Sequence, residues 1–339
     1  MSFEWSFSGE RSFNRCQRQY FIREFVASHS AKDPLRREYF VLKQLKTLDE
    51  WHGLLIHSGI EKMVVPLLSS NGRPNWDEVI ARVTKLAERQ REFSRAQRYR
   101  DATLSKSKAG DDYCALLCHD NGRDLTPEEW DATVGVVELA FRNLAGLDAL
   151  WEAIERKGRY SPELHMHLTY DGAHIVVKPD LVCFPGAGEP IIVDWKVSES
   201  MGGSDARTQM GVYAWALNRS SPGRVKSVED VALLEVQLLK PAVFLHRCDE
   251  DVLIEIENRV FRSIDEIRSL CGDGNYKTLD QMDFELAQNA NTCALCPFRK
   301  YCSASLITST PQPEILPRPK SAAQKSLFDF EEADEIAIL

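Results

Sequence analysis

Three cysteines near the end of the globular part of the sequence place the strongest limit on how this chain of 339 residues folds. Cys293, Cys296 and Cys302 form a C-x2-C-x5-C pattern, which supplies three thiolates to a metal centre. A centre with four thiolate ligands needs one more from elsewhere in the chain. Cys16 is the candidate, and as a ligand it would tie the first helix to the end of the globular part. Four thiolates bind zinc as well as an iron–sulfur cluster.

The composition is that of a globular protein outside the membrane. The chain has ample apolar content for one large domain or two small ones. No stretch approaches the length of a transmembrane helix, and the start of the sequence is not a signal peptide. We therefore expect a cytoplasmic protein without a membrane partner, in which the nine cysteines are free thiols or metal ligands.

Charge is spread unevenly along the sequence. The net charge is −9, but residues 329–335 hold five acids and no base, so the rest of the chain is closer to neutral. Residues 82–108 hold nine lysines and arginines against three acids. This basic stretch is either a DNA-facing surface or a solvated helix face, and the sequence does not separate the two.

Hydrophobic periodicity divides the sequence into a helical first part and an α/β second part. Apolar residues at helical spacing predict a helix over 34–50, a long polar helix over 76–101 and a third helix after Thr126. In the second part, Asp171-Gly172 marks a hairpin. The other expected elements are strands at 163–170, 173–178, 191–197, 231–239 and 242–246, and helices at 205–218 and 251–270. This order predicts an α/β core with a mixed sheet.

Two carboxylates and a lysine lie on neighbouring predicted strands, in an arrangement typical of a catalytic site. Asp194 and Lys196 lie two residues apart in an apolar strand and therefore share one face, and Asp180 on the adjoining strand can approach them. Two close carboxylates favour a divalent cation, which binds phosphate oxygens, and the lysine would orient or deprotonate the attacking water. The alternative is an edge-strand salt bridge, but charges in an apolar strand are costly unless they have a function.

Two further motifs accompany this constellation. Gln209 and Tyr213 have Q-x-x-x-Y spacing and share a helix face, while Gly53 and His57 form a G-x-x-x-H segment. In the order of these motifs and the four cysteines, the sequence resembles the iron–sulfur nucleases of the RecB-like PD-(D/E)XK superfamily, which include the AddB nuclease domain, exonuclease V and the CRISPR-associated exonuclease. In these relatives the histidine joins the metal site. His165 and His167 are rivals of His57 for that role.

The resemblance implies a fold and a domain plan. The expected fold is α/β, a restriction-endonuclease-like PD-(D/E)XK core with a mixed β-sheet, a helical N-terminal insertion and an iron–sulfur staple. Residues 1–305 would form one nuclease domain, with the insertion at about 60–158, the core at about 160–270 and the cluster-binding segment at 290–303. Residues 306–339 would be a proline-rich linker and an acidic tail.

The resemblance also implies an activity, namely a metal-dependent DNA nuclease that is often an exonuclease on single strands or ends. His57, Asp180 and Asp194 would hold Mg²⁺ or Mn²⁺, and Lys196 would position water and phosphate. The remaining site residues in this interpretation are the assisting Gln209 and Tyr213, and the [4Fe–4S] ligands Cys16, Cys293, Cys296 and Cys302.

The C-terminal tail, together with the absence of a nucleotide-binding motif, indicates which partner proteins to expect. Gln324, Leu327 and Phe328 form a Q-x-x-L-F segment that resembles the peptide by which bacterial DNA-processing proteins bind the sliding clamp. Alternatively, this segment folds back onto the protein or has no function. The sequence holds no phosphate-binding G-x-x-x-x-G-K loop, so any unwinding requires a helicase partner. The competing functions are a catalytically silent DNA-binding scaffold of a helicase or clamp complex, and a hydrolase of RNA or nucleotides.

Overall fold

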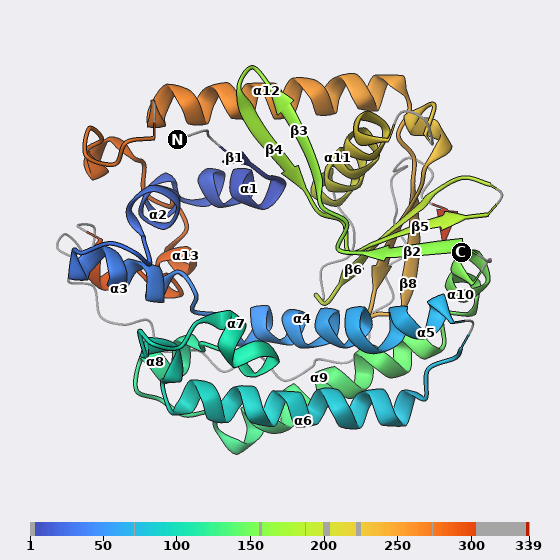
Figure 1. The fold of residues 1–339 in the computed structure, drawn as a ribbon, viewed down its shortest axis with the longest axis horizontal. Coiled ribbons are helices and arrows are strands. Elements are labelled where there is room, and N and C mark those ends of the chain that lie inside the picture. Colours follow the sequence, from blue (N-terminus) through green and yellow to red (C-terminus); the bar gives the residue numbers. More distant parts are fainter. Residues whose placement is uncertain are drawn as a thin grey trace, which may run out of the picture.

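The computed structural model of the chain describes residues 4–70, 72–155, 158–186, 188–198, 204–221, 225–272, 274–302 and 337–338. Figure 1 shows two sheets, with the helices α4, α6 and α9 along one side of the molecule and α12 along the other. None of the helices in these ranges is both long and apolar enough to cross a membrane.

The larger sheet has six strands and carries the predicted catalytic segment. Its order is β2-β5-β6-β7-β8-β9, in which β6 and β7 are parallel and every other neighbouring pair is antiparallel. The strands are β2 (Gly158–Pro162), β5 (Leu181–Pro185), β6 (Ile191–Lys196), β7 (Ala232–Gln237), β8 (Ala242–His246) and β9 (Ala337–Ile338). The predicted mixed sheet of an α/β core is confirmed.

The smaller sheet is built on the predicted hairpin. β3 (Met166–Tyr170) and β4 (Ala173–Val177) are antiparallel, and β1 (Glu4–Trp5) runs parallel to β4. The two turn residues have φ values of 43° at Asp171 and 74° at Gly172. Positive φ at both positions is the geometry that favours an Asp-Gly pair in a two-residue hairpin loop.

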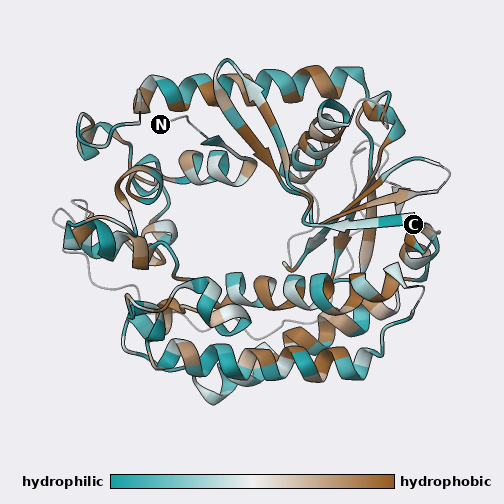
Figure 2. Ribbon diagram, viewed as in Figure 1, coloured by the Kyte–Doolittle hydropathy of each residue, from teal (hydrophilic) through white to brown (hydrophobic). Residues whose placement is uncertain are grey.

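Each face of the larger sheet is covered by its own hydrophobic core, because side chains on a strand alternate between faces. Ile192 belongs to the core shared with α11 (Ser204–Ser220) and α12 (Glu250–Cys271), whereas Val193 and Trp195 belong to the opposite core. That opposite core includes residues of α4 (Leu48–Gly59), α6 (Trp76–Arg95) and α9 (Pro127–Ala145). Figure 2 shows hydrophilic and hydrophobic residues alternating along α6 and α12, as expected for helices with one buried side.

The remaining elements are short and connect these layers. The helices are α1 (Phe7–Arg15), α2 (Gln17–Phe21), α3 (Pro34–Leu42), α5 (Val65–Ser69), α7 (Lys106–Ala109), α8 (Leu117–Asp120), α10 (Asp148–Ile154) and α13 (Ala290–Ala294). Short π-helical or 3-10 segments include η1 (Ile22–Val26), η2 (Ile60–Val64) and η7 (Arg299–Tyr301).

The single helix predicted over 34–50 is wrong, because α3 ends at Leu42 and α4 begins at Leu48. Thr47 caps α4 in a reciprocal pair with Glu50, which fixes a new helix start at this point. Just before the cap, Lys46 forms a parallel bridge with Leu116. A local cap and a long-range bridge therefore override a hydrophobic spacing that fits a continuous helix.

Candidate active site

The register of the larger sheet brings the two predicted carboxylates together. Asp180 directly precedes β5, which pairs with β6 so that Leu181 lies opposite Val193. The backbone N–H of Trp195 donates a hydrogen bond to Oδ2 of Asp180 over 2.8 Å. Asp194 therefore sits next to Asp180, and its side chain is only 4% exposed.

Lys196 and two residues of α11 surround the Asp194 carboxylate. Nζ of Lys196 lies 2.5 Å from Oδ2 of Asp194 and donates to Oε1 of Gln209 over 2.7 Å. The Tyr213 hydroxyl lies 2.6 Å from Nε2 of Gln209, from which it accepts, and donates to Oδ1 of Asp194 over 3.0 Å. Gln209 and Tyr213 reach the same carboxylate because residues four apart share a helix face.

His57 approaches the carboxylates from α4, which covers the face of the sheet opposite to α11. Its Nδ1 lies 3.2 Å from Oδ1 of Asp180, and its side chain is 33% exposed. His165 and His167 are exposed and stack on each other, with ring centroids 6.1 Å apart. Of the three candidate histidines, the structure thus places His57 beside the carboxylates.

The pKa shifts describe a crowded acidic site. Burial, followed by the charge of Asp180, raises the pKa of Asp194, although Lys196 opposes this shift. Burial and the charge of Asp194 raise the pKa of Tyr213 well above its usual value, so its hydroxyl remains a donor. Burial lowers the pKa of His57, but the hydrogen bond and charge of Asp180 outweigh burial and raise that pKa overall.

The donor set suits a divalent cation. Oδ2 of Asp194 is buried and accepts no hydrogen bond of normal geometry, although the Lys196 ammonium is within ion-pair distance. Two carboxylates and an imidazole are ligands that Mg²⁺ and especially Mn²⁺ accept. Within the described ranges, no three His, Cys, Asp or Glu side chains are already arranged closely enough to hold a metal ion. Lys196 and His57 instead neutralise the carboxylates.

Comparison with known proteins decides the family. The sequence profile of the PD-(D/E)XK nuclease superfamily matches residues 4–303. The chain belongs to the PD-(D/E)XK nuclease superfamily. This confirms the predicted α/β fold of the PD-(D/E)XK type, while the iron–sulfur staple stays a prediction, and nucleases of this superfamily use divalent metals such as Mg²⁺ or Mn²⁺.

Other comparisons add little to this result. No curated protein matches the chain significantly. The solved structure of SSO0001 is 14% identical, covers 49% of this nuclease and 76% of its own chain, and has a TM-score of 0.29. The structure of a proposed exonuclease from Eubacterium rectale is 11% identical, covers 86% and 96% of the two chains, and has a TM-score of 0.33. These scores are too low to support a conclusion about fold or function.

The sequence interpretation missed a second buried polar group on the same face of the sheet. Glu235 pairs in register with Asp194, is 1% exposed, and accepts from Nε2 of Gln237 over 2.6 Å. Its other carboxylate oxygen lies 2.8 Å from Nε2 of His246. Burial raises the pKa of Glu235, but His246, Gln237 and Lys196 together lower it. An acid within the apolar run Ala-Leu-Leu-Glu-Val was the available signal, the same one that pointed to Asp194.

The four candidate cluster cysteines lie within range of one another's charge, but within the described residues no three of them are arranged closely enough to hold a metal ion. Burial raises the pKa of Cys296 to about 11, and the charges of Cys16, Cys302 and Cys293 act on it in the same direction. Cys16 lies between α1 and α2, Cys293 lies in α13, and Cys302 follows η7. The chain thus brings residues from its two ends into electrostatic range.

A set of hydrogen bonds holds these two ends together. The backbone N–H of Arg18 donates to the carbonyl of Glu285 over 3.1 Å, and its guanidinium donates to the carbonyl of Phe284 over 3.2 Å and 3.1 Å. The backbone N–H of Glu285 donates to Oε1 of Gln17 over 3.0 Å.

The predicted clamp-binding residues Gln324, Leu327 and Phe328 lie outside the described residues.

Proposed function

We propose that this nuclease is a metal-dependent deoxyribonuclease, specifically an exonuclease on single-stranded DNA or DNA ends. The observation that carries the proposal is the hydrogen-bonded group of Lys196, Gln209 and Tyr213 on the Asp194 carboxylate, with Asp180 beside it. Asp194 is a buried carboxylate in an otherwise apolar strand, and its Oδ2 has no hydrogen-bond partner of normal geometry beyond the Lys196 ion pair, an arrangement that packing alone does not require.

In this proposal, Asp180, Asp194 and His57 hold Mg²⁺ or Mn²⁺. The metal, when bound, would act as a Lewis acid on a phosphate oxygen and would lower the pKa of a bound water molecule. Lys196 contributes a positive charge beside the phosphate, where it orients the attacking water and offsets the charge that develops on the phosphoryl oxygens. Gln209 keeps Lys196 in place through its side-chain carbonyl, and Tyr213 fixes the orientation of Asp194.

The test is cleavage of end-labelled single-stranded and double-stranded DNA by anaerobically purified protein with Mg²⁺ or Mn²⁺. Wild-type protein should degrade DNA only with metal, and Lys196→Ala should not. Lys85→Ala is the matched control, since Lys85 is exposed on α6, a helix that supplies none of the residues described around the carboxylates. Retained cleavage in Lys196→Ala would refute the proposed site. DNA binding without cleavage in any metal would favour the scaffold function, and cleavage of RNA or nucleotides alone would favour the third candidate.

We also propose that Cys16, Cys293, Cys296 and Cys302 hold a [4Fe–4S] cluster of structural role. The hydrogen bonds that join residues 17–18 to residues 284–285 support this ligand set, because they tie the segment of Cys16 to the part of the chain that leads into the other three cysteines. Cys296→Ser should remove the bound iron and its visible absorbance, whereas Cys118→Ser, a half-buried cysteine outside this set, should retain both. Metal analysis that finds zinc and no iron in anaerobic wild-type protein would contradict the cluster and favour the zinc alternative.

For the whole chain we propose one cytoplasmic nuclease domain over residues 1–305, working with a helicase and attached by its tail to a sliding clamp. Gln324, Leu327 and Phe328 would supply the clamp contacts. Replacing Leu327 and Phe328 with alanine should abolish binding to the purified bacterial clamp. Unchanged binding would rule out this peptide as the attachment point.

A further inference from the structure

Cations gather on the surface formed by the N-terminal helices and α7. A cavity of about 310 Å³ is lined by Arg15, Arg23 and Lys43, among others, and a second of about 540 Å³ by Arg15, Arg23 and Lys46. A third cavity of about 840 Å³ includes Lys106 in its lining. We refer to Arg15, Arg23, Lys43, Lys46 and Lys106 as the basic track.

The lysines of the basic track are not neutralised by acidic neighbours. Within the described ranges, Lys43, Lys46 and Lys106 form no ion pair, and Nζ of Lys43 donates instead to the carbonyl of Arg23 over 3.3 Å. Partial burial lowers the pKa of Lys106, as do the positive charges of Lys46, Lys43 and Arg23. These cations therefore lie within electrostatic range of one another, which is unfavourable unless an anion joins them.

Five acids line the same cavities as the basic track, namely Glu4, Glu24, Glu38, Glu50 and Asp101. Glu38 pairs with Arg100 over 3.0 Å, and Oδ1 of Asp101 accepts from the backbone N–H of Thr103 over 2.8 Å. Glu24 pairs with Arg23 over 2.9 Å. Glu50 lines both smaller cavities, but its Oε2 accepts from the backbone N–H of Thr47 over 2.9 Å as part of the cap of α4. Within the described residues, none of these acids forms an ion pair with Lys43, Lys46 or Lys106.

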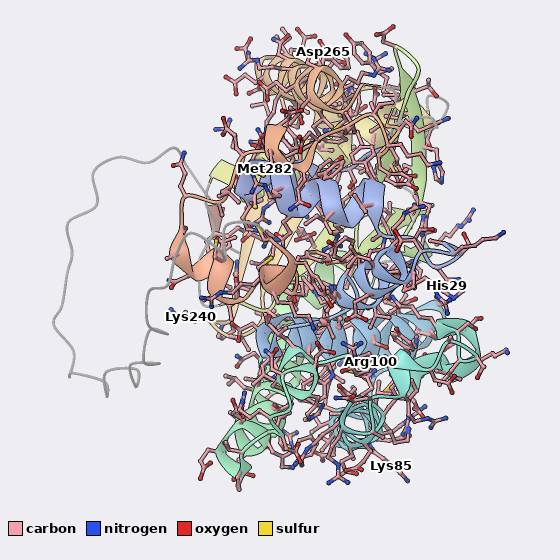
Figure 3. The ribbon with its side chains drawn as sticks, turned by 90° about the vertical axis from the view of Figure 1, so that its left-hand side faces the viewer. His29, Lys85, Arg100, Lys240, Asp265 and Met282 are labelled. Carbon is pink, nitrogen blue, oxygen red and sulfur yellow. The ribbon has the colours of Figure 1, made fainter. Side chains whose placement is uncertain are left out.

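Lys106 is the one member of the basic track that comes from the basic stretch at residues 82–108, and the arginines of that stretch on α6 behave differently. On α6, Arg82 lies 3.7 Å from Glu78, and Arg95 lies 2.7 Å from Glu92. Arg89 lies 2.7 Å from Asp112 in the following segment. The solvated helix face thus accounts for these cations. Figure 3 shows Lys85 at the lower edge of the molecule, away from the labelled His29 and Arg100, which line the cavity of about 840 Å³.

Aromatic side chains line the cavity of about 840 Å³ and lie beside cations of the basic track. Phe40, Tyr99 and Tyr113 line its wall. Nζ of Lys106 lies 5.3 Å from the ring centroid of Tyr113, and Nζ of Lys43 lies 5.6 Å from that of Phe40. A positive groove with interleaved aromatic rings suits a flexible nucleic-acid strand, whose phosphates meet the cations and whose bases stack on the rings.

Helix α4 connects the basic track to the active site. It begins two residues after Lys46 and carries His57 nine residues further on, a distance of about 14 Å along a helix axis. We propose that the basic track binds the phosphate backbone of a single strand of DNA and guides it towards the carboxylates. This inference rests on the proposed deoxyribonuclease function, whose substrate path it names.

The experiment measures binding without cleavage. Fluorescence anisotropy of labelled single-stranded DNA in EDTA gives the dissociation constant of the full chain across a salt series. The variant replaces Lys43, Lys46 and Lys106 with alanine, and the control replaces Arg82, Lys85 and Arg95, which removes the same charge from α6. All six side chains are at least partly exposed, so neither set disrupts a core, and thermal melts check the fold.

Each phosphate contact to a single strand contributes about 0.7 to the slope of log affinity against log salt. Loss of three contacts should lower the slope by about 2, so that the wild-type protein loses about 20-fold more affinity than the variant over a fourfold rise in salt. The α6 control should keep the wild-type slope. An unchanged slope in the variant, or an equal change in the control, would refute the basic track.

The outcomes separate this inference from the proposed activity. A reduced slope in the variant with no cleavage by wild-type protein would support the basic track and contradict the nuclease proposal. Normal cleavage by the wild-type protein, together with an unchanged slope in the variant, would support the nuclease proposal and contradict the basic track. Tighter binding of an RNA strand of the same sequence would overturn the assignment of DNA as the bound strand.

Discussion

Replacing Glu235 with alanine should destabilise the protein strongly, because this buried acid is the partner of two polar side chains, Gln237 and His246, on the sheet beside the active site. Its carboxylate accepts from Gln237 over 2.6 Å and lies 2.8 Å from His246, and the residue is 1% exposed. The substitution would leave both partners in the core without an acceptor.

The size of the effect follows from these two contacts. Hydrogen bonds to a charged group contribute about 1.5–3 kcal/mol each, and breaking a buried ion pair by removing one partner costs about 3–5 kcal/mol. We therefore expect the free energy of unfolding to fall by about 4 kcal/mol. At about 2.1 cal/mol/K per residue of unfolding entropy, this corresponds to a drop in Tm of about 6 °C for a chain of this length.

Urea denaturation of wild-type, Glu235→Ala and Glu235→Gln proteins measures the effect. The glutamine variant keeps an acceptor and should lose less stability. The pKa of Glu235 is lowered on folding, so its contribution is present above the pKa of the unfolded acid and disappears as the pH falls through the folded value. The difference between wild type and alanine variant should accordingly shrink in acid. A loss below about 1 kcal/mol at neutral pH would refute the reasoning.

Two further substitutions test other parts of the structure. Tyr213→Phe removes the hydroxyl that donates to Asp194 over 3.0 Å and should lower kcat/KM for DNA cleavage by about tenfold to hundredfold, so an unchanged value would contradict a positioning role. Gly59→Ala would place a Cβ 2.7 Å from both Cζ of Phe141 and Cγ2 of Val83, two fully buried side chains. Urea denaturation should show a loss of about 1–3 kcal/mol from this overpacking, and a stability equal to wild type would show that the interface of α4 adapts without strain.

The parts of the fold that depend on local chemistry could be predicted from the sequence. The hairpin at Asp171-Gly172 follows from turn residues that tolerate positive φ, and α9 begins where the Thr126 cap indicates. The proximity of Asp194 and Lys196 follows from strand alternation, since residues two apart project from one face.

Features that depend on distant contacts could not be predicted in the same way. The break before Thr47 involves the bridge between Lys46 and Leu116, and the link between Glu235 and His246 depends on how β7 meets β8. The same holds for charge: among the nine cations of residues 82–108, Arg82, Arg89 and Arg95 pair with acids in the folded chain, whereas Lys106 forms no ion pair within the described residues. Sequence proximity alone does not show which cations are neutralised.

The most direct test of the proposed active site is DNA cleavage by Asp194→Asn in the presence of Mg²⁺ or Mn²⁺, with Mn²⁺ binding measured by titration calorimetry on the same protein. Asparagine keeps the shape of the side chain and an acceptor for Tyr213 but removes the charge. We predict loss of Mn²⁺ binding and a fall in cleavage rate of about a thousandfold or more. Metal binding and cleavage at wild-type levels in this variant would contradict the assignment of Asp194 as the central metal-binding carboxylate.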